Sequence, residues 1–328
     1  MIDSQALTEN PLGDPHRRPL WVWTPPGYER QSDARYPVIY RLQSFPALIT
    51  TWRNQHPFRA DPVAVADRAL SDGSLPQVLV VYVDAWTSVG GSQYLDSPGT
   101  GRYHTYLCEE VVAFVDRQYR TLAAPEHRAL TGHSSGGYGA MVTALLRPEL
   151  FGAFASHSGD ALFEYCYLAD VRRAARALRD RYAGRPERFL KAVRTDELGR
   201  VADREGSLLN TYAMAACYSA DADGTVQLPF DRTGRMRDEV WQRWLAWDPV
   251  RMVRERGAVL REARGIWVDA GTSDDYYLDL GAQAFVAGLR EARVSKEVIA
   301  FELFDGGHGG VEWRYPLALR WLAERIAP

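Results

Sequence analysis

The chain has 328 residues, of which 46% are hydrophobic and 25% are charged, which is ordinary for a folded globular protein and excludes wholesale disorder. Lysine and arginine number 39 against 42 aspartates and glutamates, so the net charge of −3 provides no basic excess for a phosphate backbone. We therefore expect no nucleic-acid partner. The three cysteines form no Cys-x-x-Cys pair, which argues against a structural zinc site, and no metal is expected.

The first ten residues contain neither a basic segment nor an apolar run, and no stretch approaches 18 consecutive apolar residues. These features predict no signal peptide, no membrane partner and a cytoplasmic location, although a chain trimmed of its leader would look the same. Residues 1–19 are polar and contain proline, and they predict a loose N-terminal arm.

Strand and helix patterns alternate over residues 20–159 and again after residue 254. Strands are predicted at 20–24, 36–42, 77–83, 128–131, 151–156, 265–269 and 298–304. Helices are predicted at 61–70, 103–119, 136–146, 280–292 and 313–326. The run at 77–83 is almost entirely apolar, as in a strand buried on both faces of a parallel sheet. This order indicates an α/β fold with a mostly parallel central sheet flanked by helices.

The alternation stops over residues 160–253, where the clearest helices are predicted at 174–183 and 239–247. We predict that this segment is a helical lid inserted into a core formed by residues 20–159 and 254–328. Its many tyrosines and tryptophans either pack the lid onto the core or shape a pocket for an acyl or aryl group. Five arginines between positions 172 and 181 either form a solvated helix face or attract a carboxylate-bearing substrate.

A Gly-x-Ser-x-Gly pattern at residues 132–136 lies between a predicted strand and a predicted helix. In this context the serine sits on a sharp strand-to-helix turn that exposes its hydroxyl above the sheet, and the glycines let the strand and helix approach closely. Ser134 is therefore the candidate nucleophile. The alternative is a glycine-rich connection without chemistry.

A serine nucleophile needs a histidine base and an acid that orients the base, and in this fold they follow in the order serine, acid, histidine. The strand ending at Asp269 leads into a turn that contains both Asp274 and Asp275, and either could be the acid. The last strand leads into a glycine-rich loop that contains His308, which lies where a histidine base completes the order.

The residues around Ser134 resemble a known family. Gly-His-Ser-Ser-Gly-Gly-Tyr-Gly-Ala-Met at 132–141 is similar to the nucleophile turn of the Putative esterase family of α/β-hydrolases. That family includes S-formylglutathione hydrolases of the esterase D type, feruloyl and acetyl-ester hydrolases, and mycolyltransferases. The resemblance covers residues 20–160 and 262–326. Gly271-x-x-Asp274 is similar to the family's acid turn, which implies Asp274 rather than Asp275 as the acid.

The chain departs from the family at Leu42-Gln43-Ser44-Phe45-Pro46, where Ser44 stands at a position usually held by glycine. The resemblance implies that a backbone N–H here helps to form the oxyanion hole, and Pro46 has none to donate. We expect the backbone N–H groups of Ser135 and Phe45 to be the two donors. The remaining side chains expected near the substrate are Ser44, Trp52, His133 and His157.

These features predict a serine carboxylic-ester hydrolase that forms an acyl-enzyme, requires no cofactor and acts on small-molecule short-chain or aryl esters. An acyltransferase or a thioester hydrolase would use the same three residues, and a peptidase or an inactive binding module are further alternatives. The sequence leaves the oligomeric state open; a homodimer is one candidate, because it is the commonest assembly for soluble enzymes.

Overall fold

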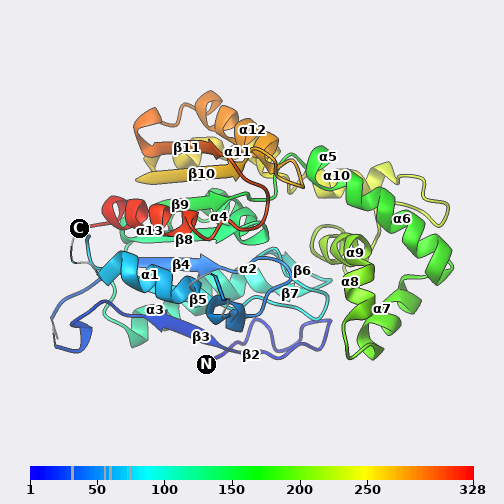
Figure 1. Cartoon of the computed structure of the whole chain (residues 1–328), viewed down its shortest axis with the longest axis horizontal. Coiled ribbons are helices and arrows are strands. Elements are labelled where there is room, and N and C mark those ends of the chain that lie inside the picture. Colours follow the sequence, from blue (N-terminus) through cyan, green and yellow to red (C-terminus); the bar gives the residue numbers. More distant parts are fainter. Residues whose placement is uncertain (31–32, 55–56, 59–60, 72, 74) are drawn as a thin grey trace.

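A seven-stranded sheet forms the centre of the protein, which we describe from a computed structural model (Figure 1). The structure describes residues 1–30, 33–54, 57–58, 61–71, 73 and 75–328. The strands of this sheet are β3 (Leu20–Trp23), β4 (Val38–Leu42), β5 (Leu79–Val83), β8 (Arg128–His133), β9 (Ala153–His157), β10 (Gly265–Gly271) and β11 (Ile299–Phe304). Their spatial order is β11-β10-β9-β8-β4-β5-β3, and every neighbouring pair is parallel except β3 and β5.

Helices cover both faces of this sheet, and every residue of its strands β4 and β5 is buried. Helices α1 (Pro62–Ser71) and α13 (Arg314–Arg325) pack on one face with a smaller hydrophobic cluster (Figure 1). The larger cluster covers the other face and includes α3 (Val112–Gln118), α4 (Ser135–Leu146), α11 (Pro249–Arg256) and α12 (Leu278–Glu291). This arrangement confirms the predicted α/β fold with a mostly parallel, helix-flanked sheet.

The segment between β9 and α11 is helical. Its helices are α5 (Phe163–Cys166), α6 (Leu168–Tyr182), α7 (Pro186–Thr195), α8 (Arg200–Arg204), α9 (Gly206–Tyr218) and α10 (Asp238–Leu245). Figure 1 shows α6–α9 beyond the sheet edge at which β4 ends, outside the two layers that cover the sheet. Because active sites of open α/β sheets lie at the carboxyl ends of the strands, these helices stand beside the functional edge.

The N-terminal residues are packed, so the expectation of a loose arm was wrong. Two short strands, β1 (Ile2–Asp3) and β2 (Arg17–Arg18), pair with each other. Leu7, which lies in the sequence between these strands, is fully buried. The Ala6 N–H donates to Glu110 at 2.8 Å, and the Ser88 N–H donates to Asp14 at 2.9 Å. These long-range contacts have no local sequence signal.

The helix predicted over 103–119 is divided into three parts. Helix α2 (Tyr103–Thr105) and α3 are joined by a π-helical turn, Tyr106–Val111. Two further short strands, β6 (Asp96–Ser97) and β7 (Gly101–Arg102), pair just before α2 and were not predicted. Among the described residues, no helix is both long enough and apolar enough to cross a membrane.

Strand β8, strand β4 and helix α4 meet at two glycines. A β-carbon at Gly132 would lie 2.3 Å from the Gly136 carbonyl carbon, and one at Gly136 would lie 2.5 Å from the Leu42 carbonyl oxygen. Both positions therefore require glycine for steric reasons. The predicted role of these two glycines in a close strand–helix approach is confirmed.

We predict that Gly136→Ala lowers the free energy of unfolding by about 1–3 kcal/mol, because the added methyl group must push α4 away from β4. Gly206→Ala is the matched control, since a β-carbon there meets no atom within 4 Å. Urea unfolding of both variants measures the difference. Equal free energies of unfolding for the two variants would show that the contact between α4 and β4 does not require glycine at position 136.

Candidate active site

Ser134 lies on the turn between β8 and α4. Its backbone has φ of 54° and ψ of −125°, a conformation that is strained for a residue with a side chain. The Ser134 N–H donates to the His157 carbonyl at the end of β9, at 2.9 Å, which ties the turn to the neighbouring strand. The sequence context therefore identified the strained turn correctly.

Three side chains from three strand ends meet at this turn. His308 Nε2 lies 3.1 Å from Ser134 Oγ, and His308 Nδ1 lies 2.9 Å from Asp274 Oδ2. Asp274 follows β10, and His308 lies in the loop after β11. The parallel sheet brings them together because all three strands end at the same edge.

Electrostatics favour a charged Asp274. Burial alone would raise the pKa of this carboxyl, but the hydrogen bond and charge of His308 and the Tyr276 N–H, 2.9 Å from Oδ1, outweigh it and the pKa is lowered. The Asp274 side chain is fully buried. Asp275, the other acid considered, is exposed and is directed to the cleft described below.

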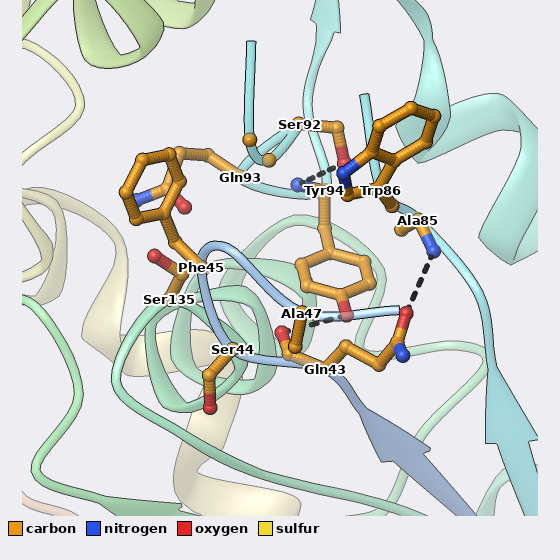
Figure 2. A pocket seen from close by; sticks show the side chains of 12 residues that line it. Gln43, Ser44, Phe45, Ala47, Ala85, Trp86, Ser92, Gln93, Tyr94 and Ser135 are labelled. Atoms are coloured by element: carbon orange, nitrogen blue, oxygen red, sulfur yellow. Dashed lines mark hydrogen bonds between the residues drawn. The ribbon is translucent and has the colours of Figure 1, made fainter. Parts of the chain in front are cut away.

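Phe45 and Ser135 line a small cavity of about 10 Å³, close to the smallest volume that holds one water molecule. Figure 2 shows both residues at its wall, with the Tyr94 hydroxyl donating to the Gln43 carbonyl, at 2.9 Å, on the same loop. Neither N–H donates to an acceptor within the described part of the chain. Ser135 is the first residue of α4, where helices leave N–H groups unpaired.

A cleft of about 630 Å³ opens above Ser134 and His308. The core contributes Phe45 and Tyr276 to its walls, and the Tyr276 ring contacts the His308 ring edge-on at 4.8 Å between centroids. The opposite wall comes from the segment that follows β9 and extends into α9. The cleft is therefore bounded by the sheet edge on one side and by the helical segment on the other.

The helical wall of the cleft is rich in charged side chains. Asp160, which is 8% exposed, accepts hydrogen bonds from Tyr167 at 2.8 Å, Gln93 at 2.9 Å and Ser135 Oγ at 3.4 Å. Burial raises the pKa of Asp160, and these neutral donors oppose the rise. Asp170 accepts from Ser207 and Asn210 at 2.7 and 3.0 Å. Sequence reasoning missed these residues, because no motif links them to Ser134.

The helical aromatic residues mostly pack the interior, as the packing interpretation predicted. Tyr218, Trp241 and Trp244 are buried, and the Trp244 ring contacts the rings of the other two. Tyr167 also lines the cleft. The five arginines at 172–181 are exposed, as expected for a solvated helix face, and only Arg173 among them lines the cleft.

Ser44 and His133 do not line the cleft. The Ser44 hydroxyl lies 2.8 Å from the His133 carbonyl oxygen and 3.3 Å from His133 Nδ1. His133 Nε2 lies 2.9 Å from the His308 carbonyl oxygen. His133 therefore contacts the main chain of His308, whereas Ser44 contacts His133 and also lines the small cavity beside Phe45 and Ser135.

Trp52 and His157 also lie outside the cleft, because both are held in the interior by other side chains. The Trp52 ring packs against the Arg41 guanidinium at 4.1 Å, and Arg41 also packs on Tyr315 at 4.3 Å. His157 is 1% exposed, and its Nδ1 lies 2.7 Å from Asp269. The expectation of substrate contact by these two residues does not agree with their positions.

No group of three or more His, Cys, Asp or Glu side chains in the described ranges is arranged to hold a metal ion. All three cysteines are free and buried.

Comparison with known proteins decides the family. The family model described as "Putative esterase" matches residues 15–320. The chain belongs to this esterase family. A solved "ferulic acid esterase" is 20% identical to this chain, with a TM-score of 0.62. The superposition covers 99% of this chain and 96% of that one. An S-formylglutathione hydrolase from Agrobacterium tumefaciens is 16% identical, with a TM-score of 0.52 and coverage of 94% and 90%.

These structural similarities show that the esterase-family chain shares the α/β-hydrolase fold. A curated relative is the "Endo-1,4-beta-xylanase/feruloyl esterase" of Xylanibacter ruminicola, 26% identical over 141 residues. That match covers 42% of this chain and 19% of the relative, so it spans about a fifth of the larger protein. The predicted family resemblance is confirmed.

We predict that His133 makes this esterase-family protein less stable as the pH falls from about 6.5 toward 3. Burial, followed by the nearby charges of His308 and His157, lowers the pKa of His133 from 6.5 to about 3. Within that window the unfolded chain binds a proton at this position and the folded chain does not, so acid favours unfolding. Thermal unfolding across the window measures the loss.

His133→Gln removes the titrating ring and should flatten this part of the stability profile. An unchanged slope in that variant would contradict a neutral, buried His133.

Proposed function

We propose that the protein is a serine carboxylic-ester hydrolase in which Ser134 is the nucleophile, His308 the general base and Asp274 the orienting acid. The observation that carries this proposal is the continuous hydrogen-bonded chain Asp274–His308–Ser134, at 2.9 and 3.1 Å, at the floor of the cleft. Membership of an esterase family supports the same reaction.

In the proposed reaction His308 Nε2 takes the proton of Ser134 Oγ while that oxygen attacks the ester carbonyl carbon. The charged Asp274 holds the proton on His308 Nδ1 and stabilises the imidazolium. The tetrahedral oxyanion accepts hydrogen bonds from the Phe45 and Ser135 N–H groups. His308 then protonates the leaving alkoxide, and water, activated by His308 in turn, hydrolyses the acyl-enzyme and releases the acid.

The substrates that we propose are small neutral short-chain or aryl esters. The relatives named as feruloyl and ferulic acid esterases support an aryl acyl group. The cleft volume of about 630 Å³ lies within the range of small-molecule sites. We propose that the helical segment 160–253 acts as the lid that forms the outer wall of this site.

The proposed roles predict a graded loss of hydrolysis. Ser134→Ala should reduce kcat for p-nitrophenyl butyrate by about 10³-fold or more, and Asp274→Asn by a comparably large factor, while both variants remain folded. Asp275→Asn is the matched control and should reduce kcat far less, because Asp275 makes no contact with His308 of the kind that Asp274 makes. Initial rates and circular dichroism of the three variants test this.

Full hydrolysis by Ser134→Ala would overturn the proposed nucleophile. A larger loss in Asp275→Asn than in Asp274→Asn would exchange the roles of the two acids.

The charges of the cleft predict discrimination against anionic esters. Four aspartates line it, at positions 160, 170, 203 and 275, against two arginines, at 173 and 204. Both arginine side chains are more than half exposed, and Arg204 pairs with Glu205. We expect kcat/KM for a p-nitrophenyl ester with a terminal carboxylate to be about tenfold below that for a neutral ester of equal length, because the buried Asp160 repels it.

Asp160→Asn should reduce this discrimination while it preserves the shape of the side chain. If the carboxylate ester is preferred and the preference is lost in Arg173→Gln, the arginine face rather than Asp160 governs recognition of charge.

A further inference from the structure

We propose that His133, held by Ser44, is a positioning residue that fixes the main chain of His308. This inference rests on the proposed function and goes beyond it, because neither side chain lines the cleft above Ser134 and His308, although Ser44 lines the small cavity beside Phe45 and Ser135. The contact that carries it is His133 Nε2 to the His308 carbonyl oxygen, at 2.9 Å.

The partner atoms determine which nitrogen of His133 carries the proton. A carbonyl oxygen can only accept a hydrogen bond, so Nε2 must be the protonated nitrogen and the donor. The ring is neutral, because burial lowers its pKa to about 3. Nδ1 is therefore an acceptor, directed to the Ser44 hydroxyl at 3.3 Å.

The Ser44 hydroxyl has one proton, and its two neighbouring acceptors, the carbonyl oxygen and Nδ1, both belong to His133. Ser44 therefore holds His133 whichever acceptor it uses. Ser44 also directly precedes Phe45, whose N–H is a proposed oxyanion donor. Figure 2 shows the Ser44 side chain turned away from the Phe45 ring. The serine found at a position where the family usually has glycine thus links the oxyanion loop to the nucleophile turn.

The His308 loop needs such a restraint. Glycines at 306, 307, 309 and 310 surround His308, and the backbone of residues 305–311 forms neither helix nor strand. Gly306 is held by the Ser273 N–H at 2.9 Å, but within the described chain the hydrogen bond to the His308 main chain comes from His133. The two rings also pack together, with centroids 4.7 Å apart. Loss of this support would let the imidazole drift from Ser134, and small displacements slow catalysis strongly.

The test compares His133→Leu, which removes the donor, with His133→Gln, whose side-chain amide can place an N–H near the position of Nε2. For hydrolysis of p-nitrophenyl butyrate, we expect His133→Leu to lower kcat by about 10–100-fold with little change in KM. His133→Gln should restore most of the lost kcat. Thr143→Val is the control, because it deletes a buried hydroxyl that has no hydrogen-bond partner among the described residues and should leave kcat unchanged.

A second measurement is independent of turnover. The proton shared by His308 Nδ1 and Asp274 should give a downfield NMR signal in the wild type and in His133→Gln, and the signal should broaden or disappear in His133→Leu. Ser44→Ala, a milder change, should lower kcat in the same direction and keeps the proposal testable if His133→Leu does not fold.

Wild-type kcat in both His133→Leu and Ser44→Ala would overturn the proposal, as would equal loss in folded His133→Leu and His133→Gln. A wild-type protein that hydrolyses no ester would instead contradict the proposed function. In that case the NMR signals of the wild type, His133→Gln and His133→Leu would still test whether His133 positions His308.

Discussion

The sharp turn at Ser134 is the constraint on which the rest of the site depends. Its positive φ is strained by about 1–3 kcal/mol for a residue with a side chain, so the surrounding sheet must hold it. Gly132 and Gly136 allow β8, β4 and α4 to approach closely enough to do so. The same turn starts α4, whose first residue is Ser135. The geometry of the proposed nucleophile and that of one proposed oxyanion donor therefore have a single origin.

The charges beneath the site are balanced in a way that suits a transient imidazolium on His308. Asp274 lies on one side of His308, and the neutral His133 ring lies 4.7 Å away on the other. A protonated His133 would repel the imidazolium, and burial prevents that protonation. Deeper in the protein, Asp269 is paired with Arg314 at 2.9 Å and contacts His157 at 2.7 Å, so its charge is compensated locally. Burial and pairing thus support the proposal that Asp274 is the acid that orients His308.

Much of the core could be predicted from the sequence, because local signals determine it. The apolar runs predicted the strands of the sheet, and the loops after parallel strands pointed to Ser134, His308 and the Asp274–Asp275 turn, within which the family resemblance implied Asp274. Trp52 and His157 were predicted near the substrate but lie in the interior, because contacts that no local signal reveals determine their positions. Their partners, Arg41 on β4 and Asp269 on β10, reach them only in the folded arrangement, and neither periodicity nor a motif shows that an aromatic ring or a histidine is enclosed by such a partner. The packed N-terminal residues escaped prediction for the same reason.

Different parts of the structure position the two walls of the cleft. This difference explains why the reaction class is easier to infer from the sequence than the substrate. The reacting groups lie at strand ends, where sheet topology fixes their mutual positions. The charged wall comes from α6, α8 and α9, whose side chains reach the cleft through the tertiary arrangement of helices. Asp160 is the point of contact between the two, since it accepts hydrogen bonds from Tyr167 of the helical segment and from Ser135 of the nucleophile turn. A substitution in the helical wall can therefore change which ester fits without moving Ser134 and His308, unless it disturbs Asp160.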